Sequence, residues 1–285
     1  RNLSREIGFL VWRTMFVRRR ERIGFVLLFI GLFIFFTFFD LQFSNFIVNR
    51  TSSFGQFFYM FGELPGTFVG LVSLALLTVS YPKLDKYKNI NIIVFGLMTE
   101  IMGFILSFQI IRYLKLEVFP YLLLGLALSI VVLYWANQLS DDVKNNIRPY
   151  AYVGFLTMAL GILVPNLLKI IWARPRYRII DENVLYHAWY IRSGIALDDN
   201  WKSFPSGHSA AAAVSLVYLY LPQVFKRFEG KERLILFVIL TWIGSVMISR
   251  VIRGDHYVTD TLFGSGITFL IFTYLNKLFI YNRKE

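Results

Sequence analysis

Three short blocks in the second half of the chain combine cations, imidazoles and a carboxylate beside long apolar runs. They lie at 169–176, 205–208 and 249–260. Charged side chains at the edge of a membrane are costly unless they pair with one another or act on a ligand. The blocks therefore indicate chemistry on an anionic group, and phosphate chemistry fits their residue types best.

Cleavage of a phosphate ester needs groups that hold the non-bridging oxygens, a nucleophile in line with the scissile bond and an acid for the leaving oxygen. An arginine offers a planar fork to phosphate oxygens, and a lysine offers a point charge. A glycine at an expected helix start lets the backbone approach an anion closely. The phosphate-binding candidates are Lys169, Arg176, Ser206, Gly207 and Arg250.

The catalytic candidates are His208, His256 and Asp260, and the two histidines are among only three in the chain. A neutral imidazole can attack phosphorus, and a protonated imidazole can donate to the leaving oxygen. On a helix, the four-residue spacing would place Asp260 on the same face as His256, where its carboxylate would orient the ring. The residues favour His256 as nucleophile and His208 as acid, and leave the reverse assignment open.

Together the blocks resemble the signature of the type 2 phosphatidic acid phosphatase superfamily, the lipid phosphate phosphatases, in its bacterial membrane-bound form. The signature reads Lys-x6-Arg-Pro, Pro-Ser-Gly-His and Ser-Arg-x5-His-x3-Asp, and the chain departs from it only where Tyr177 replaces the first block's final proline. The resemblance implies hydrolysis without metal or other cofactor, through a phosphohistidine on His256 that Asp260 supports and His208 helps to form. Because proline would stiffen this turn, Tyr177 leaves the aim of Arg176 open.

The composition predicts an all-α, polytopic transmembrane bundle. Of the 285 residues, 56% are hydrophobic, and the mean hydropathy is +0.55. The apolar runs are about 17–22 residues long, enough to cross roughly 30 Å of hydrocarbon. We expect about eight spans, near 23–40, 62–81, 90–111, 118–136, 150–171, 209–225, 234–251 and 259–280.

We divide the chain into three parts. A basic cytoplasmic or interfacial segment occupies 1–22, N-terminal spans occupy 23–149, and the catalytic core with all three blocks occupies 150–285. The resemblance implies a six-helix core, so the extra pair of spans should precede the first block.

The distribution of charge predicts the orientation. The net charge is +12, and most basic residues outside the blocks gather in segments that eight spans would place on one side. Lysine and arginine favour the cytoplasmic side, which puts both termini in the cytoplasm of a bacterial plasma membrane and the blocks outside. No nucleic-acid motif appears, so the excess charge indicates contact with membrane lipids. The absence of cysteine excludes disulfides and thiolate metal sites.

Other polar residues have two interpretations each. Arg174, Arg178 and Arg253 either widen the site for a diphosphate or anchor the interface. Glu100, inside an expected span, is either functional or part of a hydrogen bond within the bundle. The aromatic loop at 172–208 forms either an interfacial belt or a lid.

Three functions remain open. The first is an extracytoplasmic phosphatase acting on a lipid phosphate such as an isoprenoid diphosphate, phosphatidylglycerophosphate or phosphatidate. The second is a phosphotransferase that uses the same phosphohistidine, and the third, less favoured, is a transporter that binds headgroups. The sequence specifies neither the lipid nor the oligomeric state.

Overall fold

The chain forms a bundle of helices. The computed structural model describes residues 19–81 and 86–281, and no strand occurs within those ranges. Most of the expected N-terminal basic segment therefore lies outside the described residues. The helices are α2 (Arg19–Ile47), α3 (Ser53–Phe61), α4 (Leu64–Val79), α5 (Lys88–Ile111), α6 (Val118–Asn137), α7 (Asp141–Trp172), α8 (Gly207–Ala213), α9 (Leu221–Val224), α10 (Glu232–Ile252) and α11 (Val258–Asn276).

The polytopic helical architecture is confirmed. Within the described ranges, seven helical segments are long and apolar enough to cross a membrane. The expected span at 209–225 is helical but divided among α8, the 3-10 segment η4 (Val214–Tyr220) and α9. Pro222 contributes to this division, because its ring nitrogen has no hydrogen to donate to the preceding turn.

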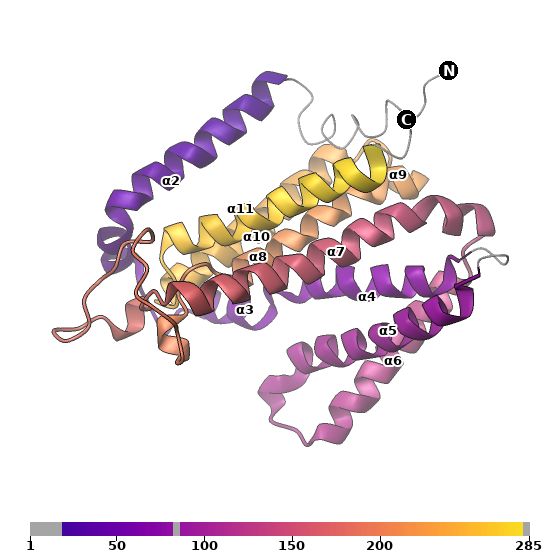
Figure 1. Ribbon diagram of the computed structural model, residues 1–285, viewed down its shortest axis with the longest axis horizontal. Coiled ribbons are helices and arrows are strands. Elements are labelled where there is room, and N and C mark those ends of the chain that lie inside the picture. Colours follow the sequence, from indigo (N-terminus) through magenta and orange to yellow (C-terminus); the bar gives the residue numbers. More distant parts are fainter. Residues whose placement is uncertain (1–18, 82–85, 282–285) are drawn as a thin grey trace.

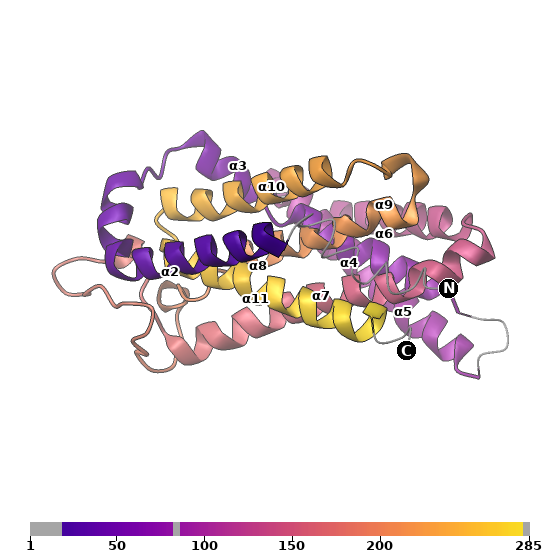
Figure 2. The same ribbon diagram turned by 90° about the horizontal axis from the view of Figure 1, so that it is seen from above.

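Helix α4 is the centre of the bundle. It is apolar all round and buried along most of its length, as expected of a helix enclosed by others. It packs against α5, α6, α7, α8 and η4 (Figures 1 and 2). Leu71, Leu74 and Leu77 are completely buried in its core cluster.

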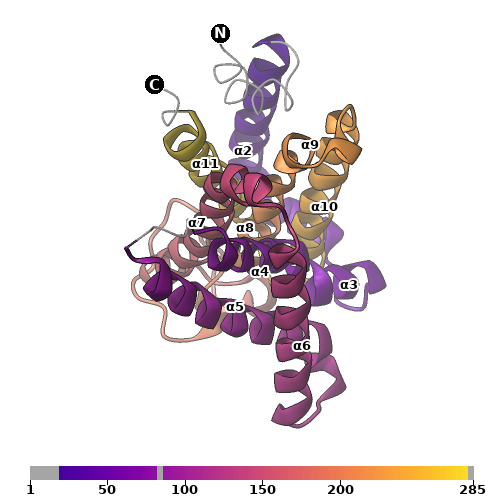
Figure 3. The same cartoon turned by 90° about the vertical axis from the view of Figure 1, so that its right-hand side faces the viewer.

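Helices α5 and α6 form a hairpin at the edge of the bundle. They pack against each other and against α4, and Figure 3 shows them projecting away from α10 and α11. We identify this hairpin with the extra pair of spans expected before the first block. Helix α2 is also peripheral: it contacts α11 and α10, but its N-terminal end leans away from them (Figure 1).

The three sequence blocks meet at one end of the bundle. The C-terminal ends of α7 and α10 lie there beside the N-terminal ends of α8 and α11 and the α3–α4 junction (Figure 1). The long loop between α7 and α8 covers the same end. The fold therefore gathers segments that are far apart in the chain.

Close packing of α11 against the second block depends on Gly264. A Cβ atom at this position would lie 2.3 Å from the carbonyl oxygen of Ser206, which is backbone and cannot rotate away. By contrast, a Cβ atom at Gly244 on α10 would meet nothing within 4 Å. Gly264 thus allows α11 to approach the start of α8.

We predict that Gly264→Ala destabilises the protein, because the added methyl group must push α11 away from Ser206. The cost should be about 1–3 kcal/mol, as for other overpacked sites. Thermal unfolding in detergent measures it, with Gly244→Ala as the matched control, which should be neutral or slightly stabilising. Equal unfolding midpoints for the two variants would contradict the packing assigned to Gly264.

Candidate active site

The turn between α10 and α11 joins Arg250 to His256. The backbone N–H groups of Asp255 and His256 both donate to the carbonyl of Arg250, at 3.1 and 3.3 Å. Gly254 enables this turn with a φ of +68°, a conformation that glycine adopts without strain. The spacing of the third block therefore closes a compact loop with both side chains at one site.

The imidazole of His256 is buried and held through Nδ1. This nitrogen lies 2.7 Å from the backbone carbonyl oxygen of Ser203 and 3.7 Å from Oδ2 of Asp260. Because a carbonyl only accepts, Nδ1 carries the proton and Nε2 keeps its lone pair. Burial lowers the pKa of His256 to about 3, although Asp260 opposes the shift.

The sequence-based placement of the histidine and the carboxylate on one helical face needs correction. His256 precedes α11, whereas Asp260 lies in its first turn, where Oδ2 accepts the N–H of Tyr257 at 2.9 Å in a capping box. The helix N-terminus, rather than a helical stripe, brings the two side chains together. Asp260 also accepts the hydroxyl of Ser203 at 2.5 Å, so its orientation is fixed from two sides.

Arg174 links Asp260 to the N-terminal helix α2. Its completely buried guanidinium donates to Oδ1 of Asp260 at 2.5 Å and to Oδ2 of Asp40 at 3.1 Å. Asp40 in turn accepts the backbone N–H of Thr259 at 3.0 Å. Arg174 therefore neither widens a phosphate site nor anchors the interface, because it forms a buried ion network behind the His–Asp pair.

The end of α7 directs Lys169 and Arg174 to different places. Ala173 ends the helix in the left-handed region, with a φ of +52°. This reversal turns Arg174 into the interior, while Lys169 in the last helical turn reaches the second block. The ammonium of Lys169 lies over Gly207, 3.0 Å from where a Cβ atom would stand.

The second block begins a helix as expected. Ser206 caps α8, its hydroxyl oxygen accepting the N–H of Ser209 at 3.4 Å, and its own N–H donates to the carbonyl of Asp260 at 2.9 Å. Gly207 and His208 occupy the first two positions of the helix. The block thus lies directly against the start of α11.

His208 faces the site from α8. Its ring stacks on Tyr59, and Arg250 lies 5.0 Å from the centroid of the same Tyr59 ring, so the second and third blocks meet here. Its Nε2 is buried and, among the described residues, has no hydrogen-bond partner. Arg250 likewise presents Nε and one terminal nitrogen without a partner, while its other terminal nitrogen contacts Asp255 at 2.8 Å. These donors can bind oxygens of an anion.

Arg176 is aimed by the loop rather than by a following proline. Its guanidinium donates to the carboxylate and the carbonyl of Asp199, at 3.0 and 2.9 Å, and to the carbonyl of Asp255 at 3.3 Å. Burial alone would raise the pKa of Asp199, but the charges and hydrogen bonds of Arg176 and Arg178 together hold it below its usual range. Tyr177 packs its ring against Tyr257, with 6.2 Å between centroids.

Two further arginines near the blocks, Arg178 and Arg253, form ion pairs at the edge of the site. Arg178 bridges Asp199 and Asp255 at 2.9 and 3.1 Å, and Arg253 contacts Asp255 at 3.0 Å. Burial alone would raise the pKa of Asp255, but Arg250 and Arg253 hold it below its usual range. A charged Asp255 therefore joins the α10–α11 turn, in which it lies, to Arg178 of the α7–α8 loop.

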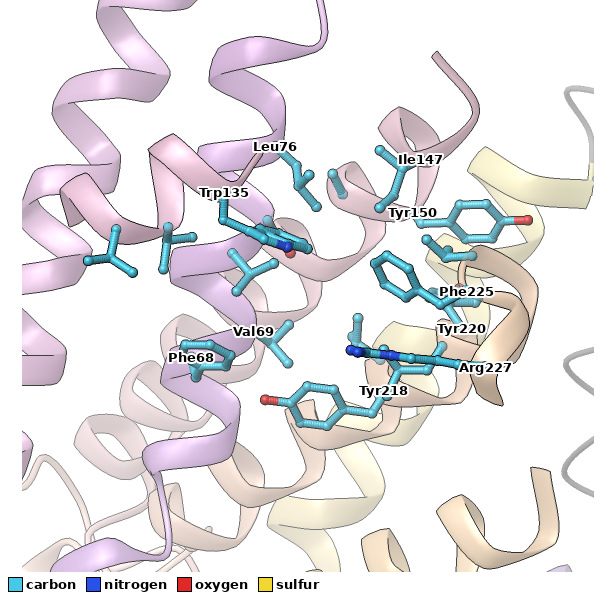
Figure 4. Close-up of a pocket in the computed structure, with 18 residues that line it drawn as sticks. Phe68, Val69, Leu76, Trp135, Ile147, Tyr150, Tyr218, Tyr220, Phe225 and Arg227 are labelled. Atoms are coloured by element: carbon cyan, nitrogen blue, oxygen red, sulfur yellow. The ribbon is translucent and has the colours of Figure 1, made fainter. Parts of the chain in front are cut away.

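The large cavity in Figure 4 lies at the opposite end of the bundle and carries no comparable chemistry. It has a volume of about 460 Å³ and lies between α4, α6, α7 and the η4–α9 segment. Its lining is mainly aliphatic and aromatic, as Trp135 and Phe225 illustrate, and includes no histidine or carboxylate. We therefore place the candidate active site at the three blocks.

Two polar residues of the site were not recognised from the sequence. Asp40 is the only carboxylate in the apolar run of α2, and Glu63 lies at the α3–α4 junction, 3.2 Å from His208. The rule that intramembrane carboxylates are functional candidates could have identified both. The carboxylate that the sequence analysis singles out, Glu100, lies in the middle of α5 and belongs to none of the three blocks.

We predict that Asp40→Asn destabilises the protein by about 3–5 kcal/mol, the usual cost of breaking a buried ion pair. The amide keeps the shape of the side chain but leaves Arg174 with one carboxylate instead of two. Unfolding in detergent measures the loss. Asp198→Asn, an exposed substitution in the α7–α8 loop, is the control and should have little effect. Equal stability of the two variants would contradict this role.

Comparison with known proteins agrees with this geometry. Residues 150–284 match the family model of the PAP2 superfamily, and this range contains all three blocks. No curated protein and no solved structure matches the chain. Residues 150–284 therefore belong to the PAP2 superfamily, and together with the apolar helices this supports a phosphatase-type function in a membrane.

Proposed function

We propose that the protein is a lipid phosphatase that hydrolyses a phosphate or diphosphate ester through a phosphohistidine on His256. The observation that carries the proposal is the state of this imidazole. Nδ1 is bound to the Ser203 carbonyl, so Nε2 holds a lone pair at neutral pH in a site lined by unpartnered cationic donors. A buried neutral nucleophile beside such donors suits attack on a phosphoryl group.

In the first step, the lone pair of His256 Nε2 forms a bond to phosphorus. The bond from phosphorus to the leaving oxygen breaks, and its electron pair stays on that oxygen. His208 gives the proton of its Nε2 to the same oxygen, so the lipid leaves as an alcohol or, from a diphosphate, as a monophosphate. Asp260 stabilises the imidazolium that the new N–P bond creates, from 3.7 Å.

In the second step, water attacks the phosphohistidine. His208, now neutral, takes a proton from the water as its oxygen bonds to phosphorus, and the N–P electron pair returns to His256. Throughout, Lys169 and Arg250 bind the non-bridging oxygens, assisted by the N–H groups of Gly207 and His208. Arg176, whose donors already have protein partners, acts mainly by holding the α7–α8 loop and adding positive potential.

The membrane helices support a lipid as substrate. The candidate site lies at one end of the bundle, where the apolar helices α7 and α10 end and α11 begins (Figure 1), and we place this end at the depth of a headgroup. A headgroup phosphate can then reach the cations while the hydrocarbon stays in the bilayer. On the distribution of lysine and arginine, we place this end on the extracytoplasmic face of a plasma membrane.

We predict that His256→Ala abolishes phosphate release from lipid phosphates, because no other group takes the phosphoryl. Wild-type protein quenched during turnover of a ³²P-labelled substrate should carry an acid-labile, base-stable phosphoryl group, and the variant should carry none. Both measurements should give the same result with a chelator present. Normal turnover by the folded variant, or strict dependence of the wild type on added Mg²⁺, would contradict the mechanism.

We also predict that lowering the pH from about 7 to 5 does not switch off the nucleophile. With its pKa at about 3, His256 stays neutral over this range, whereas an ordinary histidine would become protonated below 6.5. kcat/KM, corrected for titration of the substrate, should therefore show no fall between pH 7 and 5. A fall that follows a single group near pH 6.5 would contradict a neutral, buried His256.

A further inference from the structure

Glu63 is paired with the histidine that serves as acid in the proposed function, on which this inference rests. Its Oε1 lies 3.2 Å from Nδ1 of His208, across the interface between the α3–α4 junction and α8. The two side chains are 24% and 21% exposed, so the pair lines an accessible part of the site rather than the deep core. The carboxylate accepts the Nδ1 proton, which leaves Nε2 as the nitrogen that faces the substrate.

The carboxylate and the imidazole are both held in place. Gln109 near the end of α5 donates from Nε2 to the second oxygen of Glu63 at 3.2 Å. Tyr59 on α3 stacks on the His208 ring, with 5.7 Å between centroids and 20° between planes. The ring is therefore fixed at one edge by Glu63 and on one face by Tyr59.

The surrounding charge explains why His208 needs a carboxylate. The cations that act on it are Arg250 from α10, Lys169 from α7 and Arg112 from η1 (Arg112–Leu114), and the second imidazole is His256. Burial, together with these positive charges, lowers the pKa of His208 well below its usual range, yet only a protonated imidazole can donate to the leaving oxygen. Glu63 supplies the opposing negative charge in direct contact with the ring.

We propose that Glu63 is a positioning residue for the general acid, holding His208 protonated with Nε2–H directed at the leaving oxygen. Glu63 itself exchanges no proton with the substrate. When His208 gives its Nε2 proton to the leaving oxygen, the Nδ1 proton remains between the imidazole and the carboxylate, and the water of the second step restores the Nε2 proton. The substrates that depend on Glu63 are those with strongly basic leaving oxygens, such as lipid alkoxides.

The carboxylate and the amide that holds it both come from outside the part of the chain that matches the family model. Glu63 and Gln109 precede residue 150, and Gln109 belongs to the α5–α6 hairpin. The hairpin thus reaches the active site through one hydrogen bond to the carboxylate. This contact gives the extra pair of spans a role in positioning the acid.

The test is Glu63→Gln, which keeps the shape of the side chain and removes its charge. Purified wild-type and variant proteins are assayed with phenyl phosphate, whose leaving group is basic, and p-nitrophenyl phosphate, whose leaving group needs no proton. kcat/KM for phenyl phosphate should fall on the order of tenfold to a hundredfold, within the usual contribution of an acid catalyst. kcat/KM for p-nitrophenyl phosphate should fall less than about threefold. This parameter reports only the steps up to departure of the leaving group, and p-nitrophenolate departs without a proton.

The pH profile of kcat/KM gives a second readout. It would stay unchanged if Glu63 only stabilised the fold. Without the carboxylate, His208 loses its proton more easily, so the alkaline fall of kcat/KM for phenyl phosphate should set in at lower pH in Glu63→Gln. Glu100→Gln is the matched control, since it makes the same change within α5 away from the site. It should leave both substrates and the profile unchanged.

Two outcomes would overturn the proposal: equal losses with both aryl phosphates, or an unchanged alkaline limb. Its failure is distinguishable from failure of the proposed function, because labelling of His256 does not require Glu63 when the leaving group is p-nitrophenolate. If Glu63→Gln forms the phosphohistidine from p-nitrophenyl phosphate and shows no selective loss, only the role of Glu63 is wrong. If wild-type protein forms no phosphohistidine, the phosphatase mechanism itself is wrong.

Discussion

The buried ion network around Arg174 is the interaction on which the rest of the site depends. A guanidinium with no exposed surface is tolerable only if carboxylates neutralise it, and here Asp40 and Asp260 do so from opposite sides. Because these three residues lie on α2, the α7–α8 loop and α11, their pairing fixes three segments relative to one another. The carboxylate that faces His256 is therefore positioned by contacts outside the catalytic turn.

The proposed mechanism gives the two histidines opposite tasks, and their hydrogen-bond partners differ. His256 must be neutral to attack, and burial, with a backbone carbonyl at Nδ1, keeps it so. His208 must be protonated to donate, and Glu63 lies in direct contact with it. Burial lowers the pKa of both imidazoles, so the carboxylate in contact with His208 is the feature that distinguishes the proposed acid from the proposed nucleophile.

The sequence was most informative where chemistry and spacing are local. It predicted the helical membrane architecture and the capped start of α8 beside Ser206, and the three blocks that it singled out all lie within the range of the superfamily match. It could not predict the partner of Arg174. Asp40 is 134 residues away, and a lone carboxylate in an apolar run does not indicate which cation it will contact in the fold. The effect of Tyr177, which replaces the motif's proline beside Arg176, could not be predicted for the same reason. The residues that aim Arg176 are Asp199 and Asp255, and no local pattern links them to the first block.

The same long-range contacts explain why the N-terminal spans cannot be treated as a passive addition to the matched region. Residues 150–284 contain the proposed nucleophile, the proposed acid and the cationic side chains of the three blocks. Asp40, one of the two carboxylates that balance Arg174, and Glu63, which faces His208, both come from the part of the chain before residue 150. A cationic site must balance its attraction for phosphate against the repulsion among its own charges. The N-terminal spans contribute to that balance at two points, one behind His256 and one beside His208, so the candidate site depends on both parts of the chain.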